Sequence, residues 1–551
     1  MTDRLGIGIA QINPVVGDIR GNIEKIRAGA EKLADADLVV FPELAVSGYP
    51  PEDLVMKPVF ADDCRAAVEA LAAELTEGPA LLVGTPWREG GKLYNAVALL
   101  EGGKVAAVRF KVMLPNYDVF DEKRVFEAGP MPSPINFRDV RIGVPICEDI
   151  WSPDVVECLE ESGAEIIIAP NGSPFELGKP EVRLNQVVAR VTESGLPLMY
   201  VNIVGGQDEL VFDGGSFVID ASRRLKAQLS GWREDFALTE WERGPNGAWT
   251  CAHGPVADVP EGLPSMYHAA MLGLRDYVDK NGFPGILLGL SGGIDSALSA
   301  AIAVDALGPD RVRCVMMPSP YTSKDSLEDA AECARMLGVS YEIISIGPAM
   351  AAFDEMLSSA FAGTEAGVTE ENIQSRSRGL TLMALSNKFG HMVLSTGNKS
   401  EMAVGYATLY GDMCGGYNAI KDIYKTTVFE LCKWRNEHAP TDVLGPAGPV
   451  MPARVIAKPP SAELRPDQKD EDSLPPYPVL DGILERMIEG EQSAAEIVAA
   501  GYDEDTVRRI WRLLDISEYK RFQAPPGAKI SRKNFGRDRR YPLTNGFRRQ
   551  I

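Results

Sequence analysis

Short apolar runs alternate with helical segments along most of this 551-residue chain, and that alternation restricts the possible folds more than any other feature. In the first half the apolar runs cover residues 5–12, 38–41, 81–83, 96–100, 142–146, 166–169 and 198–201. In the second half they cover residues 286–290, 312–316, 341–346 and 392–395. Such runs, separated by helices or by Gly- and Asp-rich turns, are typical of strands in α/β folds. The pattern predicts a layered α/β domain with hairpins, followed by a Rossmann-like parallel sheet.

The composition changes between the two halves. Residues 231–263 mix Trp, Gly, Pro and acidic residues without a clear period, which favours a linker or a crossing segment. We therefore expect a first domain at residues 1–250, a linker at 251–265 and a second domain at 266–551. Residues 458–477 hold five prolines and many charges, which predicts a long loop, either ordered or gating a site.

The balance of charges limits the partners. The chain has 56 Lys and Arg against 78 Asp and Glu, a net charge of −22, which argues against nucleic-acid binding because phosphate contacts need a cationic surface. Residues 508–551 are the exception, with thirteen Lys or Arg against three Asp or Glu, a net +10. Composition alone leaves two readings of this tail open, a solvated segment or a site for an anion.

Targeting and metal signals are weak throughout. The N-terminus lacks the apolar region of a signal peptide, and no apolar stretch reaches the length of a membrane span, so we expect a cytoplasmic protein without membrane contact. The eight cysteines lack CxxC spacing, which argues against a zinc site or a disulfide framework. A catalytic His would have to be one of only four, at positions 253, 268, 391 and 438.

Three segments of the first half place a reactive side chain at a predicted strand end, where α/β folds carry their catalytic groups. These side chains are Glu43 in Phe-Pro-Glu-Leu, Lys111 in Phe-Lys, and Cys147 in Ile-Cys-Glu-Asp-Ile-Trp. A thiol needs a base to become nucleophilic, and Glu43 could accept its proton. Lys111 and a backbone N–H after Cys147 could stabilise the oxyanion of a tetrahedral intermediate. Each residue alone is equally compatible with a structural role.

The same three segments, in this order, resemble the carbon–nitrogen hydrolase (nitrilase) superfamily over residues 1–250. The resemblance implies an αββα sandwich with Glu43, Lys111 and Cys147 as catalytic residues, and it needs no histidine. In the members that hydrolyse glutamine, a Tyr after the Lys and a Ser and a Lys after the Cys hold the substrate. By position these residues are Tyr117, Ser173 and Lys179, whose hydroxyl and ammonium groups suit an α-carboxylate.

A glycine-rich loop follows the apolar run at residues 286–290 and opens a helix. Its sequence, Ser-Gly-Gly-Ile-Asp-Ser at 291–296, fits neither the Walker A loop nor the dinucleotide fingerprint. Glycines allow backbone N–H groups to approach phosphate oxygens, and a helix N-terminus favours negative charge. The loop resembles that of the PP-loop ATP pyrophosphatases, which cleave ATP between its α and β phosphates and adenylylate a carbonyl oxygen.

Further segments of the second half, taken in order, resemble the synthetase domain of NAD synthetases. They are residues 372–379, 395–401, 410–426 and 519–521, and with residues 460–469 and the amidase half the whole chain resembles the glutamine-dependent members. The resemblance implies substrates glutamine, ATP and deamido-NAD, with Mg²⁺ as cofactor. It assigns the ATP contacts to Gly289, Leu290, Ser291, Gly292, Gly293, Ile294, Asp295, Ser296, Thr396 and Lys425. It assigns deamido-NAD contacts to Asn372, Glu401 and Lys520, and Mg²⁺ ligation to Asp295 and Glu401, with Asp412 a weaker candidate.

This reading predicts an enzyme that amidates deamido-NAD to NAD with ammonia from glutamine, through an adenylylated intermediate. The resemblance also implies an ammonia tunnel and a homo-oligomer. Two rivals stay open at this stage. One is a PP-loop amidotransferase that acts on another carboxylate or on a purine carbonyl. The other is an amidase joined to a domain that binds ATP without cleaving it.

Overall fold

The computed structural model describes residues 3–466 and 468–547 of the chain. It divides into two compact units, Met1–Pro260 and Glu261–Ile551, and the division falls inside the linker expected at residues 251–265. Each unit is built around its own sheets and is described by itself. Among the described residues, no helix is both long enough and apolar enough to cross a membrane.

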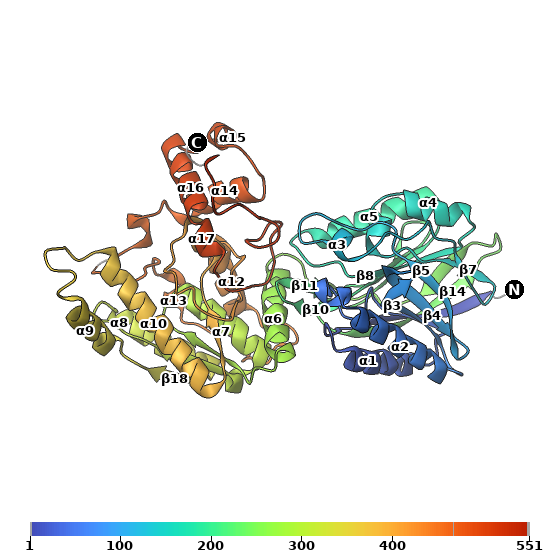
Figure 1. The fold of residues 1–551 in the computed structure, drawn as a ribbon, viewed down its shortest axis with the longest axis horizontal. Helices are drawn as coiled ribbons and strands as arrows, with labels where there is room; N and C mark the ends of the chain where they lie inside the picture. The colour runs from blue at the N-terminus through green and yellow to red at the C-terminus, as the bar shows by residue number, and fades with distance from the viewer. Residues whose placement is uncertain (1–2, 467, 548–551) are drawn as a thin grey trace. The chain divides into compact units, whose positions relative to one another are not determined.

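The N-terminal unit contains two large sheets (Figure 1). The larger has the strand order β15 (Trp249–His253), β14 (Asp235–Arg243), β1 (Arg4–Gln11), β2 (Leu38–Val40), β3 (Ala80–Glu89), β4 (Lys92–Glu101) and β5 (Lys104–Phe110). The other has the order β13 (Leu225–Gln228), β12 (Phe217–Ile219), β9 (Leu198–Asn202), β8 (Ile166–Asn171), β7 (Val140–Gly143) and β6 (Ile135–Phe137). A separate hairpin joins β10 (Val204–Gln207) to β11 (Leu210–Asp213).

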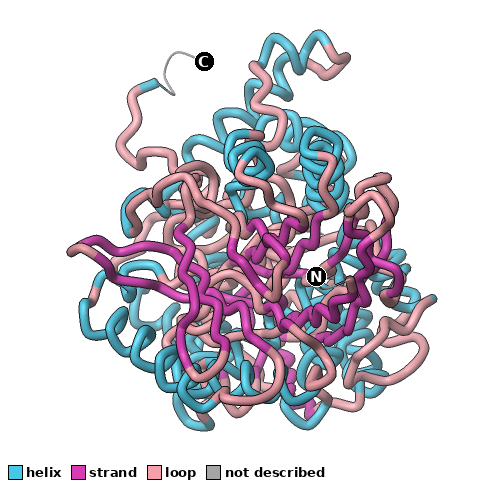
Figure 2. Tube along the Cα trace, turned by 90° about the vertical axis from the view of Figure 1, so that its right-hand side faces the viewer, coloured by secondary structure: helices cyan, strands magenta, loops and turns pink. Residues whose placement is uncertain are grey.

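These sheets form the two inner layers of an αββα sandwich, as expected. One apolar core lies between the sheets and joins side chains such as Ile7, Val97 and Ile168. The outer face of the larger sheet packs on α1 (Ile19–Lys32) and α2 (Pro58–Glu74). The outer face of the other packs on α4 (Asp154–Glu161) and α5 (Lys179–Ser194). Figure 2 shows these layers, with strands lying between helices above and below.

Residues 231–263, for which the sequence left a linker or a crossing segment open, are largely part of the N-terminal fold. They contain β14 and β15, and β14 pairs antiparallel with the first strand of the chain, from Arg4 opposite Glu242 to Gln11 opposite Asp235. Ala237, Thr239 and Trp241 point into the core while Glu240 and Glu242 face outward. Burial of every second residue is typical of a strand with one exposed face. Such a strand has no continuous apolar run, so the sequence carries no clear signal for β14.

The C-terminal unit has a five-stranded sheet in which every pair is parallel, which confirms the Rossmann-like prediction. Its order is β18 (Ser340–Ile343), β17 (Val312–Met316), β16 (Ile286–Gly289), β19 (Met392–Ser395) and β20 (Tyr417–Asn418). From β16 the chain continues to β17 and β18 on one side of β16, and then returns to β19 and β20 on its other side. The strand order therefore reverses between β16 and β19. Ligands of open α/β sheets bind at the carboxyl ends of the strands beside such a reversal.

Helices cover both faces of this parallel sheet. On one face lies α10 (Val368–Phe389), whose Leu382 packs on Leu287, Val315 and Val393. On the other lies α7 (Ile294–Leu307), which is buried along nearly its whole length. The remaining helices of the unit are α6 (Leu263–Lys280), α8 (Lys324–Leu337), α9 (Gly347–Leu357), α11 (Lys399–Val404), α12 (Lys425–Glu437), α13 (Ala453–Ala457), α14 (Tyr477–Ile488), α15 (Ala494–Ala499), α16 (Glu504–Ile516) and α17 (Glu518–Arg521).

Candidate active sites

The structure brings the three predicted groups of the first site together at strand ends. Glu43 lies just beyond β2, Lys111 directly follows β5, and Cys147 begins a short 3-10 helix, Cys147–Ile150, after β7. All three side chains are buried. Lys111 Nζ donates to Glu43 Oε1 at 2.7 Å, and both charges act on the Cys147 thiol.

The carboxylate of Glu43 is held by fixed donors on both oxygens. Asn95 Nδ2 donates to Oε1 at 2.7 Å, and the backbone N–H of Gly172 donates to Oε2 at 2.7 Å. A side chain at position 172 would be crowded, since a Cβ there would lie 2.9 Å from the Tyr49 ring and 3.1 Å from Glu43 Oε2. Glycine at this position therefore lets the backbone approach Glu43 closely, and the Glu43 carboxylate is held in one orientation.

A second buried carboxylate, Glu122 at the start of α3 (Glu122–Val125), completes this cluster and was missed from the sequence. Its Oε1 accepts from Lys111 Nζ at 2.9 Å and from the Tyr49 hydroxyl at 2.9 Å. Burial raises the pKa of Glu122 to about 7, with Lys111 opposing the rise and Glu43 adding to it. Burial alone would lower the pKa of Lys111, but the two carboxylates raise it well above its ordinary value. The lysine therefore stays cationic.

Cys147 has an unusual backbone conformation. Its φ is +47°, a left-handed conformation that non-glycine residues seldom adopt. Asp149 fixes this turn, since Oδ2 accepts from the Ile146 N–H at 2.9 Å and Oδ1 from the Met113 N–H at 2.7 Å. Burial and the Glu43 carboxylate raise the pKa of the Cys147 thiol, while Lys111 and the Gly172 N–H oppose the rise. The resting thiol is therefore protonated, so attack by its sulfur would need a base to take the proton.

Residues predicted to bind the substrate amino acid lie near Cys147. The Tyr117 hydroxyl donates to Glu148 Oε2 at 2.9 Å, and Lys179 Nζ lies 4.8 Å from the centroid of the Trp151 ring. Burial raises the pKa of Glu148, and Tyr117, Lys111 and Lys179 all oppose that rise. Glu148 directly follows Cys147 in the sequence, and the sequence analysis assigned it no role. Its carboxylate and the Lys179 ammonium offer opposite charges to an amino acid.

In the C-terminal unit, the predicted glycine loop joins β16 to α7. Ser291 and Ser296 shape it, because the Gly293 N–H donates to Ser291 Oγ at 3.2 Å and Ser296 Oγ donates to the Gly293 carbonyl at 2.9 Å. Gly292 has a φ of +77°, and a Cβ there would lie 2.3 Å from the carbonyl oxygen of Ser326. Only glycine fits this position without moving the neighbouring backbone.

A cavity of about 390 Å³ opens beside this loop, at the carboxyl ends of the parallel strands. It is lined by most of the residues predicted to contact nucleotide, namely Gly289, Leu290, Ser291, Gly293, Ile294, Asp295, Ser296, Thr396, Glu401 and Lys425. It is also lined by Arg378 and by residues 458–464 of the proline-rich loop. A volume of this size accommodates a nucleotide-sized ligand.

Acidic and basic groups meet on the wall of this cavity. Lys425 Nζ bonds to an oxygen of Asp295, and it lies 3.2 Å from Glu401 Oε1. Burial raises the pKa of Glu401 to about 8, while Lys425 opposes the rise and Asp295 adds to it. Asp470, which the sequence analysis did not assign, also lines the cavity, and among the residues that the structure describes its Oδ1 has no partner that meets hydrogen-bond geometry. Crowded carboxylates of this kind are the oxygen donors that suit Mg²⁺ beside phosphates. Within residues 3–466 and 468–547, however, no three His, Cys, Asp or Glu side chains are already arranged to hold a metal ion.

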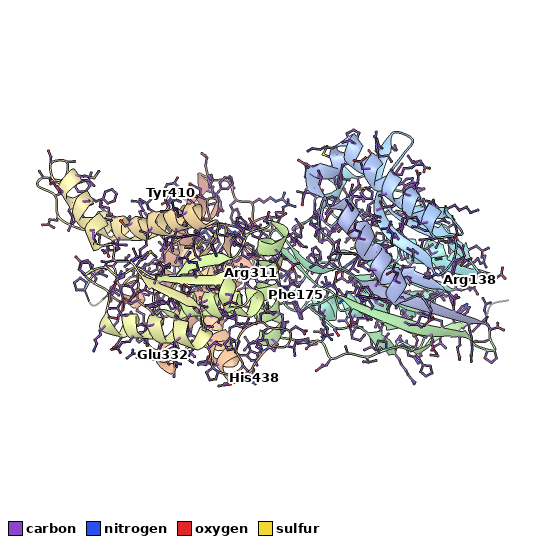
Figure 3. All side chains as sticks on the ribbon, turned by 90° about the horizontal axis from the view of Figure 1, so that it is seen from below. Arg138, Phe175, Arg311, Glu332, Tyr410 and His438 are labelled. Atoms are coloured by element: carbon purple, nitrogen blue, oxygen red, sulfur yellow. The ribbon has the colours of Figure 1, made fainter. Side chains whose placement is uncertain are left out.

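Two of the predicted dinucleotide residues are bonded to the chain instead of lining the cavity. Asn372 Oδ1 accepts from Thr408 Oγ1 at 2.9 Å. Lys520 Nζ donates to the carbonyls of Gly405 at 2.7 Å and Ala407 at 2.6 Å. Both therefore brace residues 405–408, of which Tyr406 and Ala407 reach the cavity wall. The adjoining Tyr410, labelled in Figure 3, is exposed, and its hydroxyl bonds to Gln523 at 3.0 Å.

The basic tail uses part of its charge inside the fold. Lys529 Nζ pairs with Asp538 at 2.7 Å, and Arg521 donates to the carbonyl of Ala403 at 2.6 Å. Lys399, buried in the segment that follows β19, donates to the carbonyl of Lys533 at 2.7 Å. The described tail thus packs against the helix that carries Glu401. Composition suggested only a solvated segment or an anion site, and structural pairing is a third use of these cations.

Both halves of the chain match known families. The carbon–nitrogen hydrolase model matches residues 6–249, and the NAD synthase model matches residues 266–524. The chain is 51% identical over 552 residues to the glutamine-dependent NAD(+) synthetase of Rhodobacter capsulatus, with all of both chains covered. It is 48% identical to that of Xanthomonas campestris, with 98% of both covered. The chain belongs to the glutamine-dependent NAD synthetases.

Solved structures agree with this membership. The glutamine-dependent NAD+ synthetase of Acinetobacter baumannii in complex with ADP is 42% identical, with a TM-score of 0.78 over 99% of both chains. The synthetase of Cytophaga hutchinsonii has the same fold, with a TM-score of 0.82 at 22% identity. Because the relatives match end to end, the nitrilase-like fold, the PP-loop fold and their order in one chain all follow from the family.

Proposed function

We propose that this chain converts deamido-NAD to NAD, using ATP and ammonia that it releases from glutamine. The observation that carries the proposal is the combination, in one chain of this family, of the buried Glu43–Lys111–Cys147 cluster with the cavity at the glycine loop. The first supports amide hydrolysis and the second supports nucleotide chemistry. Free ammonia at neutral pH is mostly ammonium, which is not nucleophilic, so coupling the two reactions in one protein has a chemical reason.

The glutaminase reaction follows from the groups around Cys147. Glu43 takes the thiol proton as sulfur attacks the side-chain carbonyl carbon of glutamine. Lys111 and a backbone N–H after Cys147 stabilise the oxyanion. Glu43 then gives the proton to the amide nitrogen and the C–N bond breaks. Ammonia is released, and the glutamyl group remains bound to Cys147 as a thioester. Water attacks the thioester, with Glu43 again accepting a proton, and glutamate is released as the thiol re-forms.

Substrate recognition in this half follows from charge. The α-carboxylate of glutamine suits the Lys179 ammonium and the Ser173 hydroxyl, and its α-ammonium suits Glu148 with Tyr117 beside it. We propose these four residues as the glutamine site. The buried position of Ser173 and the electrostatic interactions of Tyr117 and Lys179 with Glu148 support the assignment.

In the synthetase half, a carboxylate oxygen of deamido-NAD attacks the α phosphorus of ATP, and the bond to the β phosphate breaks. We assign the phosphate contacts to the N–H groups of residues 289–296 and to the Lys425 ammonium, because most of these residues line the cavity. Ammonia then attacks the adenylylated carbonyl carbon, and AMP leaves. Mg²⁺, when bound, would neutralise phosphate charge, with Asp295 and Glu401 as its protein ligands. Asn372, Glu401 and Lys520 are proposed to form the deamido-NAD site, the first and last through residues 405–408.

The location and assembly of the protein belong to the same proposal. We propose a cytoplasmic homo-oligomer that contacts neither nucleic acid nor membrane. Sedimentation velocity checks the assembly, and a monomer across micromolar concentrations would contradict it.

The decisive experiment compares glutamine and free ammonia as nitrogen donors in Cys147→Ala. We expect glutamine-supported NAD formation to vanish while ammonia-supported formation survives. A folded variant that loses both would refute the separable two-site reaction. Release of AMP and pyrophosphate that depends on deamido-NAD is the second readout, and its absence from the unmodified enzyme would refute the synthetase assignment.

A further inference from the structure

A buried guanidinium lies directly behind the proposed glutamine site. Arg183 on α5 is 3% exposed, as are Ser173 and Asp213. Its Nη1 donates to Asp213 Oδ1 at 2.7 Å and to Oδ2 at 2.8 Å. Its Nη2 donates to the carbonyls of Ser173 at 2.8 Å and Pro174 at 2.7 Å, and its Nε donates to Ser173 Oγ at 3.0 Å.

All three nitrogen atoms of the guanidinium donate to protein oxygens, and a guanidinium has no acceptor. Arg183 is also buried, so it holds Ser173 from inside the fold. It also fixes the polarity of Ser173, because Oγ must accept from Nε, which leaves the single hydroxyl hydrogen to point elsewhere.

The backbone of Ser173 is held as firmly as its side chain. The Ser173 N–H donates to Asn202 Oδ1 at 3.0 Å, and Asn202 Nδ2 donates to the Ser173 carbonyl at 3.2 Å. Two residues on, Phe175 (labelled in Figure 3) packs edge-on against Trp232, with ring centroids 4.8 Å apart. With the backbone fixed, the direction of the Ser173 hydroxyl depends on its side-chain neighbours, Arg183 and Tyr200.

The arginine also lies close to the reacting cysteine. The charges of Arg183 and Cys147 act on each other, and both act on the buried Tyr200 hydroxyl. The Tyr200 hydroxyl also lies beside Ser173: burial raises the pKa of Tyr200, and the Ser173 hydroxyl acts to lower it. The arginine and this tyrosine have no part in the hydrolysis steps themselves, which the cluster around Glu43 performs.

We propose that Arg183, clamped by Asp213, is a positioning residue that makes Ser173 a hydrogen-bond donor to the α-carboxylate of glutamine. The proposal rests on the glutamine site assigned above. A carboxylate only accepts hydrogen bonds, so a serine beside it is useful only when its hydroxyl hydrogen is free to point there. Arg183 secures that orientation without competing for the substrate.

The test is a double-mutant cycle on the full-length enzyme, with Arg183→Lys, Ser173→Ala and the double variant. Loss of one hydrogen bond to a charged group should raise KM for glutamine roughly ten- to a hundredfold in each single variant, with a smaller change in kcat. The double variant should show no further rise, because Arg183 acts only through Ser173. Ammonia-supported NAD synthesis should stay at the unmodified level in all three.

Arg190→Lys is the matched control, since Arg190 is a buried arginine on the same helix that pairs with Glu193 at 2.8 Å. We expect it to leave KM for glutamine unchanged. If Arg183→Lys does not fold, Asp213→Asn loosens the same clamp and should raise KM in the same way.

Three results would overturn the proposal: additive effects in the double variant, a loss of kcat with KM unchanged, or an equal rise of KM in Arg190→Lys. Failure of the proposed function looks different, because the unmodified enzyme would then form no NAD from glutamine. If Ser173→Ala alone left KM unchanged, the assignment of Ser173 would be wrong, and the role of Arg183 with it.

Discussion

Replacement of Glu122 by Gln tests whether the glutaminase cluster carries a cost in stability. The carboxyl group is buried beside Glu43, and its pKa is raised from 4.5 to about 7. A pKa unit corresponds to about 1.4 kcal/mol, so this rise corresponds to about 3 kcal/mol of differential stability.

The sign follows from proton binding. Between pH 4.5 and about 7 the folded enzyme keeps a proton on Glu122 that the unfolded chain has released. The favourable contribution is therefore complete below pH 4.5 and is lost as the pH rises through 7. Glu122→Gln cannot titrate, so its stability relative to the unmodified enzyme should increase by up to about 3 kcal/mol from pH 4.5 to pH 8.

Urea unfolding at a series of pH values, followed by tryptophan fluorescence, measures this difference. The amide can also change the free energy of unfolding by an amount that does not depend on pH. This amount cancels when the stability difference between the two proteins is compared at two pH values. Glu127→Gln is the control, because Glu127 is exposed and should show no such trend. Glutaminase activity of Glu122→Gln should fall, since Lys111 loses one of its two anionic partners. A variant with the same pH dependence as the unmodified enzyme would refute the reasoning.

Three further substitutions probe other parts of the fold. Gly292→Ala, whose Cβ would lie 2.3 Å from the Ser326 carbonyl, should lower AMP formation with either nitrogen donor at least tenfold, and normal AMP formation would refute the close fit of the loop. Gly172→Ala should reduce glutamine-supported NAD synthesis and spare ammonia-supported synthesis, and equal losses would contradict its assignment to the glutaminase site. Arg435→Met removes the guanidinium that lies 2.6 Å from the buried Asp305 carboxylate. It should lower the urea midpoint of the C-terminal unit by the equivalent of about 3–5 kcal/mol. An unchanged midpoint would show that the ion pair does not stabilise this unit.

The proposed reactive groups could be selected from the sequence because they follow apolar strands. Cys147, Lys111 and the glycine loop each stand at the end of such a strand, where a single short pattern predicts both the strand and the residue that ends it. The parallel order in the second half was predictable for a related reason, since its central strands are buried on both faces and read as continuous apolar runs.

Residues whose role depends on packing could not be found in this way. β14 was missed because only alternate residues face the core. Glu122 lies in a short helix beyond any strand end, and its importance depends on Lys111 reaching it across the fold. Arg183 reads as a surface residue of an amphipathic helix, and only the tertiary structure brings Asp213 to it. Asn372 and Lys520 both bond to residues 405–408, and neither bond could be deduced from the sequence.

The backbone angle at Cys147 has a consequence for engineering. A left-handed conformation at a residue with a Cβ costs about 1 kcal/mol or more, and only glycine would relieve it. A selection for thermal tolerance alone would therefore favour Cys147→Gly and yield a sturdier protein that depends on external ammonia. The backbone strain at Cys147 is thus a cost in stability that comes with a cysteine at this position.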